Sequence, residues 1–377
     1  MKRKILLLLL LLLLFVPMRA RADDAEPIEQ DLTEILRQLD LSEWDAWFAE
    51  QGGTDAFVPS RFLEVTVLGK EGGFSQWETG LRWKEVLREP IQRSLRTFLW
   101  YLGFGILAVC INGLRSGNGA DDSVAYVSAT LAGCLSLTVA APLVVSAGKT
   151  METIAAGYEV VFPVLLSCLM LFGMNRSVAA LEPLSLTLVG GVIGGIKTVV
   201  FPLALIGGVL AALNGISGGR NAEFSKLCYR SSRWILGIVS SLYLALTALK
   251  SNVALQADGV LVKTTKIAAG SLPFVGGLVS DSVDTVYRCL LLVRSALGVT
   301  GILALTLAVL RPLLTLFLQR CALKLAAACL RPIAPASYAD TLHSIGDMLG
   351  IVSLCVLAVL VMGAMTAGMI MGVGSVG

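Results

Sequence analysis

Apolar residues in this chain gather in long blocks, separated by short polar stretches, from residue 97 to the last residues. A helix that crosses a bilayer needs about 20 predominantly apolar residues, and the blocks approach or reach that length. The pattern therefore predicts an all-α fold, a polytopic transmembrane helical bundle of about eight spans. We place the spans at 97–114, 124–147, 158–174, 178–196, 198–213, 234–249, 286–310 and 348–372.

The first 22 residues have the pattern of an export signal. Three basic residues, Lys2 to Lys4, precede an apolar run from Ile5 to Val16 that is too short to span a bilayer. Ala20 and Ala22 then supply small side chains at the two positions that a signal peptidase reads. We predict a signal peptide, residues 1–22, that is cleaved after Ala22. The alternative is an uncleaved short anchor.

The segment that follows, residues 23–96, is polar and acidic, with sixteen Asp and Glu against eight Lys and Arg. We interpret it as a small exported segment. It includes one amphipathic helix, because Leu32, Ile35, Leu36 and Leu39 recur at helical spacing. Residues 97–377 form the predicted multi-pass membrane domain.

Composition supports the membrane assignment, because 55% of the residues are hydrophobic and only 15% are charged. Soluble globular chains carry about 25% charged residues. With an exported amino end, alternate crossings place two basic clusters in the cytoplasm, as the positive-inside rule requires. These clusters are Arg220, Lys226, Arg230 and Arg233, and then Arg311, Arg320, Lys324 and Arg331. We predict an amphipathic cytoplasmic helix at 312–330.

One pentapeptide occurs twice in the carboxyl half. Leu-Gly-Ile-Val-Ser is found at 236–240 and again at 349–353. The two copies indicate either an internal repeat, as in many transporters, or a chance match between apolar segments.

Glycine-rich segments also stand out in the membrane domain. In the run GGVIGG, Gly190 and Gly194 are four residues apart, as are Gly191 and Gly195. On a helix this spacing gives a smooth groove that favours close packing of another helix. A substrate path lined by backbone is the second interpretation.

A break in the apolar pattern lies near residues 270–284, at Gly270, Pro273, Gly276 and Gly277. Irregular backbone at membrane depth is tolerated only where protein or water surrounds it. We therefore predict a re-entrant or interfacial turn that leads into a new helix.

Two carboxylates, Asp281 and Asp284, follow this turn. In the first interpretation Ser280 or Asp281 caps the new helix, and both carboxylates lie in its first turn. In the second, the pair faces a polar pathway with Arg288 as its partner.

Motifs of soluble enzymes are not found. The sequence Gly148-Lys149-Thr150 lacks the upstream glycine of a phosphate-binding loop, and the single histidine, His343, has no Cys near it. The eight cysteines include no CxxC pair, and the basic residues do not form a concentrated nucleic-acid-binding face. We expect no enzyme activity, no cofactor, no metal site and no nucleic-acid partner.

The region around the turn resembles a known family. The runs KIAAG at 266–270 and LPFVG at 272–276, the residues Ser280-Asp281 and Asp284-Thr285-Val286, and the glycines Gly298 and Gly301 resemble the signature region of stage III sporulation protein AE. The export signal, the acidic segment and Leu330-Arg331-Pro332-Ile333 fit the same layout.

This resemblance implies a multi-pass protein of the mother-cell membrane around the forespore of an endospore-forming bacterium. It also implies partners, namely the other proteins of an eight-protein stage III sporulation operon and a forespore membrane protein. Together these resemble a secretion-type channel across two membranes, which forespore development requires. The resemblance implies that residues 23–96 are extracytoplasmic. The alternative function is a secondary permease that moves a small solute.

Overall fold

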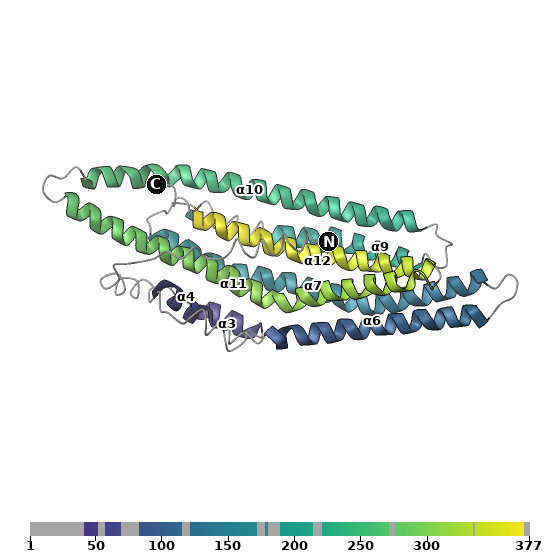
Figure 1. Ribbon diagram of the computed structural model, residues 1–377. Coiled ribbons are helices and arrows are strands. Elements are labelled where there is room, and N and C mark those ends of the chain that lie inside the picture. The colour runs from purple at the N-terminus through teal and green to yellow at the C-terminus, as the bar shows by residue number, and fades with distance from the viewer. Residues whose placement is uncertain are drawn as a thin grey trace.

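A computed structural model describes residues 41–51, 57–68, 83–114, 121–171, 178–179, 189–213, 221–270, 276–334 and 336–372. Within these ranges the fold is all-helical, as predicted, and contains no strand. Figure 1 shows an elongated bundle whose long helices run side by side. The elements are α3 (Ser42–Glu50), α4 (Pro59–Leu68), α6 (Trp83–Leu114), α7 (Asp121–Leu171), η1 (Ile196–Val200), α9 (Phe201–Leu213), α10 (Ala222–Gly270), α11 (Gly276–Leu330) and α12 (Ala336–Gly372).

Three helices are much longer than a bilayer is thick. With 51, 49 and 55 residues, α7, α10 and α11 are each about 75–80 Å long at about 1.5 Å per residue. The hydrocarbon core of a bilayer is only about 30 Å thick. Among the residues that the structure describes, five helices are long and apolar enough to cross it: Thr130–Met170, Val189–Leu213, Ala222–Leu249, Leu291–Leu330 and Ala336–Met371.

Helix α12 lies at the centre of the bundle, in contact with α7, α9, α10 and α11. Its apolar face is almost entirely buried. Two buried tyrosines bond to backbone carbonyls of neighbouring helices: the Tyr158 hydroxyl donates to the Leu360 carbonyl at 2.9 Å, and the Tyr338 hydroxyl donates to the Tyr101 carbonyl at 3.1 Å. These bonds satisfy polar groups inside the bundle and set the relative height of α7, α12 and α6.

The two short amino-terminal helices pack onto the side of the bundle. Trp44, Trp47 and Phe48 of α3 are buried, and the Trp44 indole N–H donates to the Val160 carbonyl of α7 at 3.1 Å. Helix α4 packs against α11. The amphipathic helix predicted near residues 32–39 and the signal peptide with Ala20 and Ala22 lie outside the described residues.

The structure joins segments that the sequence pattern separates. The predicted spans 124–147 and 158–174 belong to one helix, α7, which has no break between them. Between these two predicted spans, Glu152 forms an ion pair with Lys197, and the segment stays helical. Likewise, residues 189–213 are helical throughout, across the break predicted between 196 and 198.

Two further predicted boundaries lie inside helices. Helix α6 runs through the boundary that we placed between residues 96 and 97. The segment 312–330 is the last part of α11 rather than a separate amphipathic helix. Its basic residues lie in contact with α12, so they do not require a surface helix of their own.

At the predicted turn, α10 ends at Gly270 and α11 begins at Gly276, followed by Gly277, while Pro273 lies outside the described residues. Because α11 begins at Gly276, Ser280 and Asp281 lie inside the helix and not at its N-cap. Asp284 and Arg288 follow within α11. Figure 1 shows that this α10–α11 hairpin extends past the end of α12.

Candidate functional site

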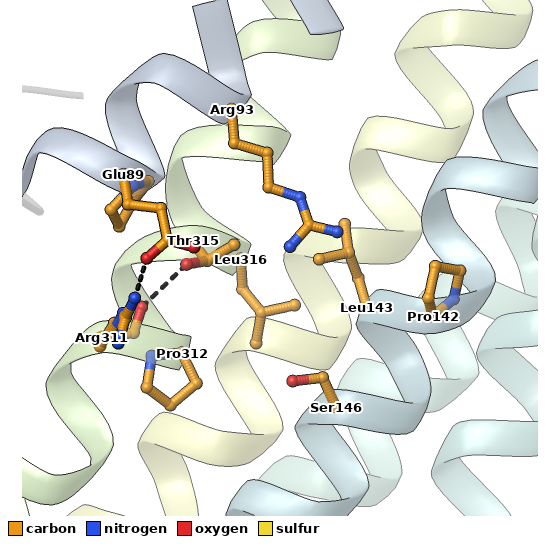
Figure 2. A pocket seen from close by; sticks show the side chains of 10 residues that line it. Glu89, Arg93, Pro142, Leu143, Ser146, Arg311, Pro312, Thr315 and Leu316 are labelled. Carbon is orange, nitrogen blue, oxygen red and sulfur yellow. Dashed lines mark hydrogen bonds and ion pairs between the residues drawn. The ribbon is translucent and has the colours of Figure 1, made fainter. Parts of the chain in front are cut away.

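A polar pocket lies where three helices meet, and all three contribute a proline to it. Its wall consists of Glu89, Pro90 and Arg93 of α6, Pro142, Leu143 and Ser146 of α7, and Arg311, Pro312, Thr315 and Leu316 of α11. Figure 2 shows these side chains around one space, with Arg93 reaching across it from α6. The cavity volume is about 240 Å³.

The three prolines weaken the backbone hydrogen bonding of the helices around this space. Proline has no N–H, so the carbonyl four residues earlier in the helix loses its usual partner. The carbonyls concerned are those of residues 86, 138 and 308, preceding Pro90, Pro142 and Pro312. Three helices thus carry a weak point in their backbone hydrogen bonding at the same height, and a proline in a helix interior is the usual cause of a kink.

Charged and hydroxyl side chains complete the pocket. The Arg311 guanidinium forms an ion pair with the Glu89 carboxylate, joining α11 to α6 (Figure 2). The Thr315 hydroxyl donates to the Arg311 carbonyl at 2.9 Å. With Arg93 the pocket carries two cations and one carboxylate, a net charge of +1. Both ends of the ion pair are well exposed, so water screens their attraction.

The size of the pocket limits what it can hold. A cavity needs only about 10–15 Å³ for one water, whereas pockets for drug-sized ligands measure about 300–1,000 Å³. At about 240 Å³ this pocket accommodates several waters or one small anionic solute. Its hydroxyls and guanidinium groups suit hydrogen bonding to such a solute, and no nucleophile and base face each other among its lining residues.

A second polar feature lies inside two of the apolar spans. Lys197 of η1 forms an ion pair with Glu152 of α7, and the Glu152 carboxylate is mostly exposed on the outside of the bundle. The π-helical segment Ile196–Val200 interrupts the α-helical pattern at the lysine. Segments of this kind are rare and occur frequently at functional sites.

The residues predicted from sequence do not gather in this pocket. Asp281, Asp284 and Arg288 lie near the start of α11, and Asp284 is about 40 Å along the helix from Arg311. The glycines of GGVIGG form part of an exposed helix face. Among the described residues, no atom lies within 4 Å of the position that a Cβ would take at Gly190, Gly191, Gly194 or Gly195.

Sequence reasoning missed the residues that join the helices. Glu89, Arg311, Glu152 and Asp347 are single charges whose partners are distant in sequence, so spacing alone does not reveal them. The signal that was available is the presence of a proline inside each of three apolar helices. In the described ranges, no three His, Cys, Asp or Glu side chains gather as metal ligands would.

The exterior of the bundle defines the class of protein. Large apolar side chains such as Val145, Ile206, Ile238 and Met365 are exposed on the candidate spans, where lipid rather than water accommodates them. The chain is therefore a helical membrane protein, and its described part contains five helices long and apolar enough to cross a bilayer.

The particular family is given by comparison with known proteins. The family model of stage III sporulation protein AE matches residues 117–374, more than half of the chain. The chain belongs to this family, which confirms the resemblance seen around residues 266–301. It is thus a membrane protein associated with sporulation. No curated protein and no solved structure matches the chain.

Proposed function

We propose that this chain is a membrane subunit of a channel or secretion-type complex that links the mother cell and the forespore and that forespore development requires. Its membership of the sporulation family supports this role. The observation that carries the proposal is the length of the helices, because α10 and α11 exceed the thickness of a bilayer and form a hairpin beyond α12 (Figure 1). Such a hairpin can reach partners outside the lipid.

The proposed location and partners follow from the same role. The chain resides in the mother-cell membrane around the forespore, and its partners are the other stage III sporulation operon proteins and a forespore membrane protein. Its contribution is structural and not enzymatic. The cross-helix ion pair between Glu89 and Arg311 supports a scaffold role, since it joins α6 to α11 beside the proline-lined pocket.

The proposed topology starts from an exported amino end, delivered by a cleaved signal peptide at residues 1–22. Helix α6 then makes the first crossing, and the five apolar spans make the others. This gives six crossings in place of about eight, because α7 joins one pair of predicted spans and the helical residues 189–213 cross the break predicted between another pair. Joining two pairs of predicted spans removes two crossings, an even number, so the later loops stay on the same sides of the membrane. The segments before α10 and between α11 and α12 remain cytoplasmic, as the positive-inside rule favours.

The proposed internal repeat corresponds to two helix hairpins. The pentapeptide copies at 236–240 and 349–353 lie in α10 and α12. Helix α9 precedes the first copy and the carboxyl half of α11 precedes the second. In Figure 1 the two hairpins point the same way along the bundle, which favours a direct repeat over an inverted one.

A second candidate function, a permease for a small solute, is favoured by one observation. Glu152 and Lys197 form an ion pair inside two apolar spans, at a π-helical segment. Ionisable residues inside spans are costly and often mark substrate or ion pathways. The proline-lined pocket, with a volume of about 240 Å³, is of a size for a small solute.

One experiment separates the two functions. The gene is deleted in the native bacterium and replaced by the wild type or by the double variant Glu152→Leu/Lys197→Leu, and heat-resistant spores are counted. Replacing both members together leaves neither charge without its partner inside the apolar spans. A scaffold subunit should therefore keep the spore yield of the wild type, provided that immunoblots show equal protein in the membrane fraction.

The outcomes are distinct. Normal spore counts in the deletion strain would rule out any required role in sporulation. A double variant that is present in normal amount but gives few spores would favour the permease. The matched control Glu223→Leu/Lys226→Leu removes an exposed ion pair at the start of α10 and should give normal spore counts in either case.

A further inference from the structure

Basic residues from two separate parts of the sequence meet at one carboxylate. Asp347 of α12 accepts a hydrogen bond from the Lys324 ammonium of α11 at 2.7 Å. A guanidinium nitrogen of Arg233, from α10, lies 3.7 Å from the same carboxylate oxygen. His343, one turn earlier on α12, places its Nε2 atom 3.7 Å from the other oxygen. We name these residues, together with Arg320, the Asp347 cluster.

Two glycines make room for the basic side chains. Gly346 and Gly350 are one turn apart on α12, facing Lys324 and Arg320, which are one turn apart on α11. A Cβ atom at Gly350 would lie 2.6 Å from Cζ of Arg320, and one at Gly346 would lie 3.0 Å from Cγ of Lys324. The surface of α12 therefore has a recess where the two cations lie, and larger side chains at Gly346 and Gly350 would displace these cations.

The Asp347 cluster has more positive than negative charge. Three cations, Arg233, Arg320 and Lys324, face one carboxylate, which leaves a net charge of +2 with His343 neutral. In the part of the chain that the structure describes, no carboxylate pairs with Arg320. Asp347 is 24% exposed and Lys324 is 30% exposed, whereas Arg233 is 52% exposed, so the cluster extends from a partly buried carboxylate to the surface of the bundle. An anion with two or more oxygen acceptors is the ligand that this charge recognises.

Exposed apolar side chains follow two of the cations in sequence, on the same helices. Arg233 is followed by Trp234, which is 68% exposed, and Lys324 is followed by Leu325, which is 58% exposed. Both helices belong to the candidate spans. A soluble anion gains nothing from this apolar surface, whereas the acyl chains of a lipid bury it.

We propose that the Asp347 cluster binds the phosphate of an anionic phospholipid, with the acyl chains lying along α10 and α11 beside Trp234 and Leu325. Arg320 and Lys324 supply the main contacts to the phosphate, and Asp347 positions Lys324 and Arg233. Basic pockets between transmembrane helices are known places for anionic head groups. This inference does not depend on the channel role, since it concerns only how the chain meets lipid.

Lipid binding by the purified full-length protein in detergent tests the proposal. Native mass spectrometry measures the lipid retained after titration with phosphatidylglycerol or with phosphatidylcholine. The variants are Arg320→Gln, Arg320→Lys and the double variant Arg320→Gln/Lys324→Gln. The matched control is Arg230→Gln, which removes an exposed cation one turn before Arg233. Glycerol phosphate, which has the head-group charge without acyl chains, serves as a competitor.

The wild type should retain phosphatidylglycerol in preference to phosphatidylcholine. The double variant should lose affinity by about tenfold or more, because two cations that attract the anionic head group are removed together. Arg320→Lys and Arg230→Gln should bind as the wild type does. Arg320→Gln leaves the Lys324–Asp347 pair intact, so this variant tests the site even if the double variant does not fold.

Three results would overturn the proposal. One is equal retention of phosphatidylglycerol by the wild type and by both glutamine variants. Another is equal retention of phosphatidylcholine and phosphatidylglycerol by the wild type. The last is full competition by glycerol phosphate at concentrations equal to the lipid, which would assign the cluster to a soluble anion.

Discussion

Two groups of glycines in this bundle lie on similar apolar helices but have opposite surroundings. Gly133 and Gly363 face neighbours so close that a Cβ atom would overlap them, namely the backbone of Ala212 and the ring of Tyr158. Gly190 and Gly194, which have the spacing typical of helix packing, face no described atom within 4 Å. Glycine spacing thus predicts a smooth helix surface, but it does not identify the surface that the chain itself covers.

The difference has a physical cause. Close packing at Gly363 depends on one large ring from another helix, and Tyr158 is 205 positions away in the sequence. The Tyr158 hydroxyl is anchored on the Leu360 carbonyl, which holds the ring against the gap that glycine leaves. At Gly190 and Gly194 no such partner exists among the described residues, so this face is available to another helix.

The largest expected effect comes from adding a methyl group at Gly363, where the Tyr158 ring already fills the space beside the glycine. In Gly363→Ala the new methyl group overlaps the Tyr158 ring, which is 1% exposed and has no room to move. We expect the free energy of unfolding to fall by about 3 kcal/mol, the upper part of the usual range for overpacking. Thermal unfolding of the detergent-solubilised protein, followed by circular dichroism, measures the change. An unchanged midpoint would show that α7 and α12 do not pack as described.

A smaller effect is expected from the other side of the same contact. Tyr158→Phe keeps the ring in the gap at Gly363 but removes the hydrogen bond to the Leu360 carbonyl. The buried carbonyl then lacks this donor, and we expect a loss of about 1 kcal/mol. The same thermal unfolding assay applies. A loss as large as that of Gly363→Ala would indicate that the hydroxyl, and not the fit of the ring, dominates the contact.

The smallest effect is expected at the open glycines. Gly194→Ala meets no described atom, so the free energy of unfolding of the isolated chain should stay unchanged or rise by up to about 1 kcal/mol, because alanine favours a helix. Gly190→Ala should behave in the same way. A loss comparable with that of Gly363→Ala would show that this face is already covered within the chain.

Much of the helical architecture could be predicted from the apolar pattern. The spans near 234–249 and 348–372 lie within α10 and α12, and the family was identified from residues 266–301 before the match to 117–374 confirmed it. The helix ends were harder to predict, since the gap of 148–157 between two predicted spans lies inside α7. Glu152, in this gap, pairs with Lys197 from 45 positions away, and the apolar pattern does not reveal this contact.

The candidate site could not be predicted for a related reason. Pro90, Pro142 and Pro312 are visible in the sequence, yet their convergence depends on how α6, α7 and α11 align in space. The ion pair of Glu89 with Arg311 likewise joins residues 222 positions apart. The roles predicted for Asp281 and Asp284 stay predictions, while the start of α11 at Gly276 removes the capping position from Ser280 and Asp281.

The most direct test of the account concerns the sides of the membrane. Single cysteines are placed at residues 60, 225, 260 and 335 in a chain whose eight native cysteines are replaced. The chain is expressed in vegetative cells, where it lies in the cytoplasmic membrane, and the intact cells are treated with a membrane-impermeant maleimide. The proposed topology predicts labelling at 60 and 260, with 225 and 335 labelled only after lysis. Labelling of 225 and 260 from the same side would contradict it, because α10 would then not cross the bilayer.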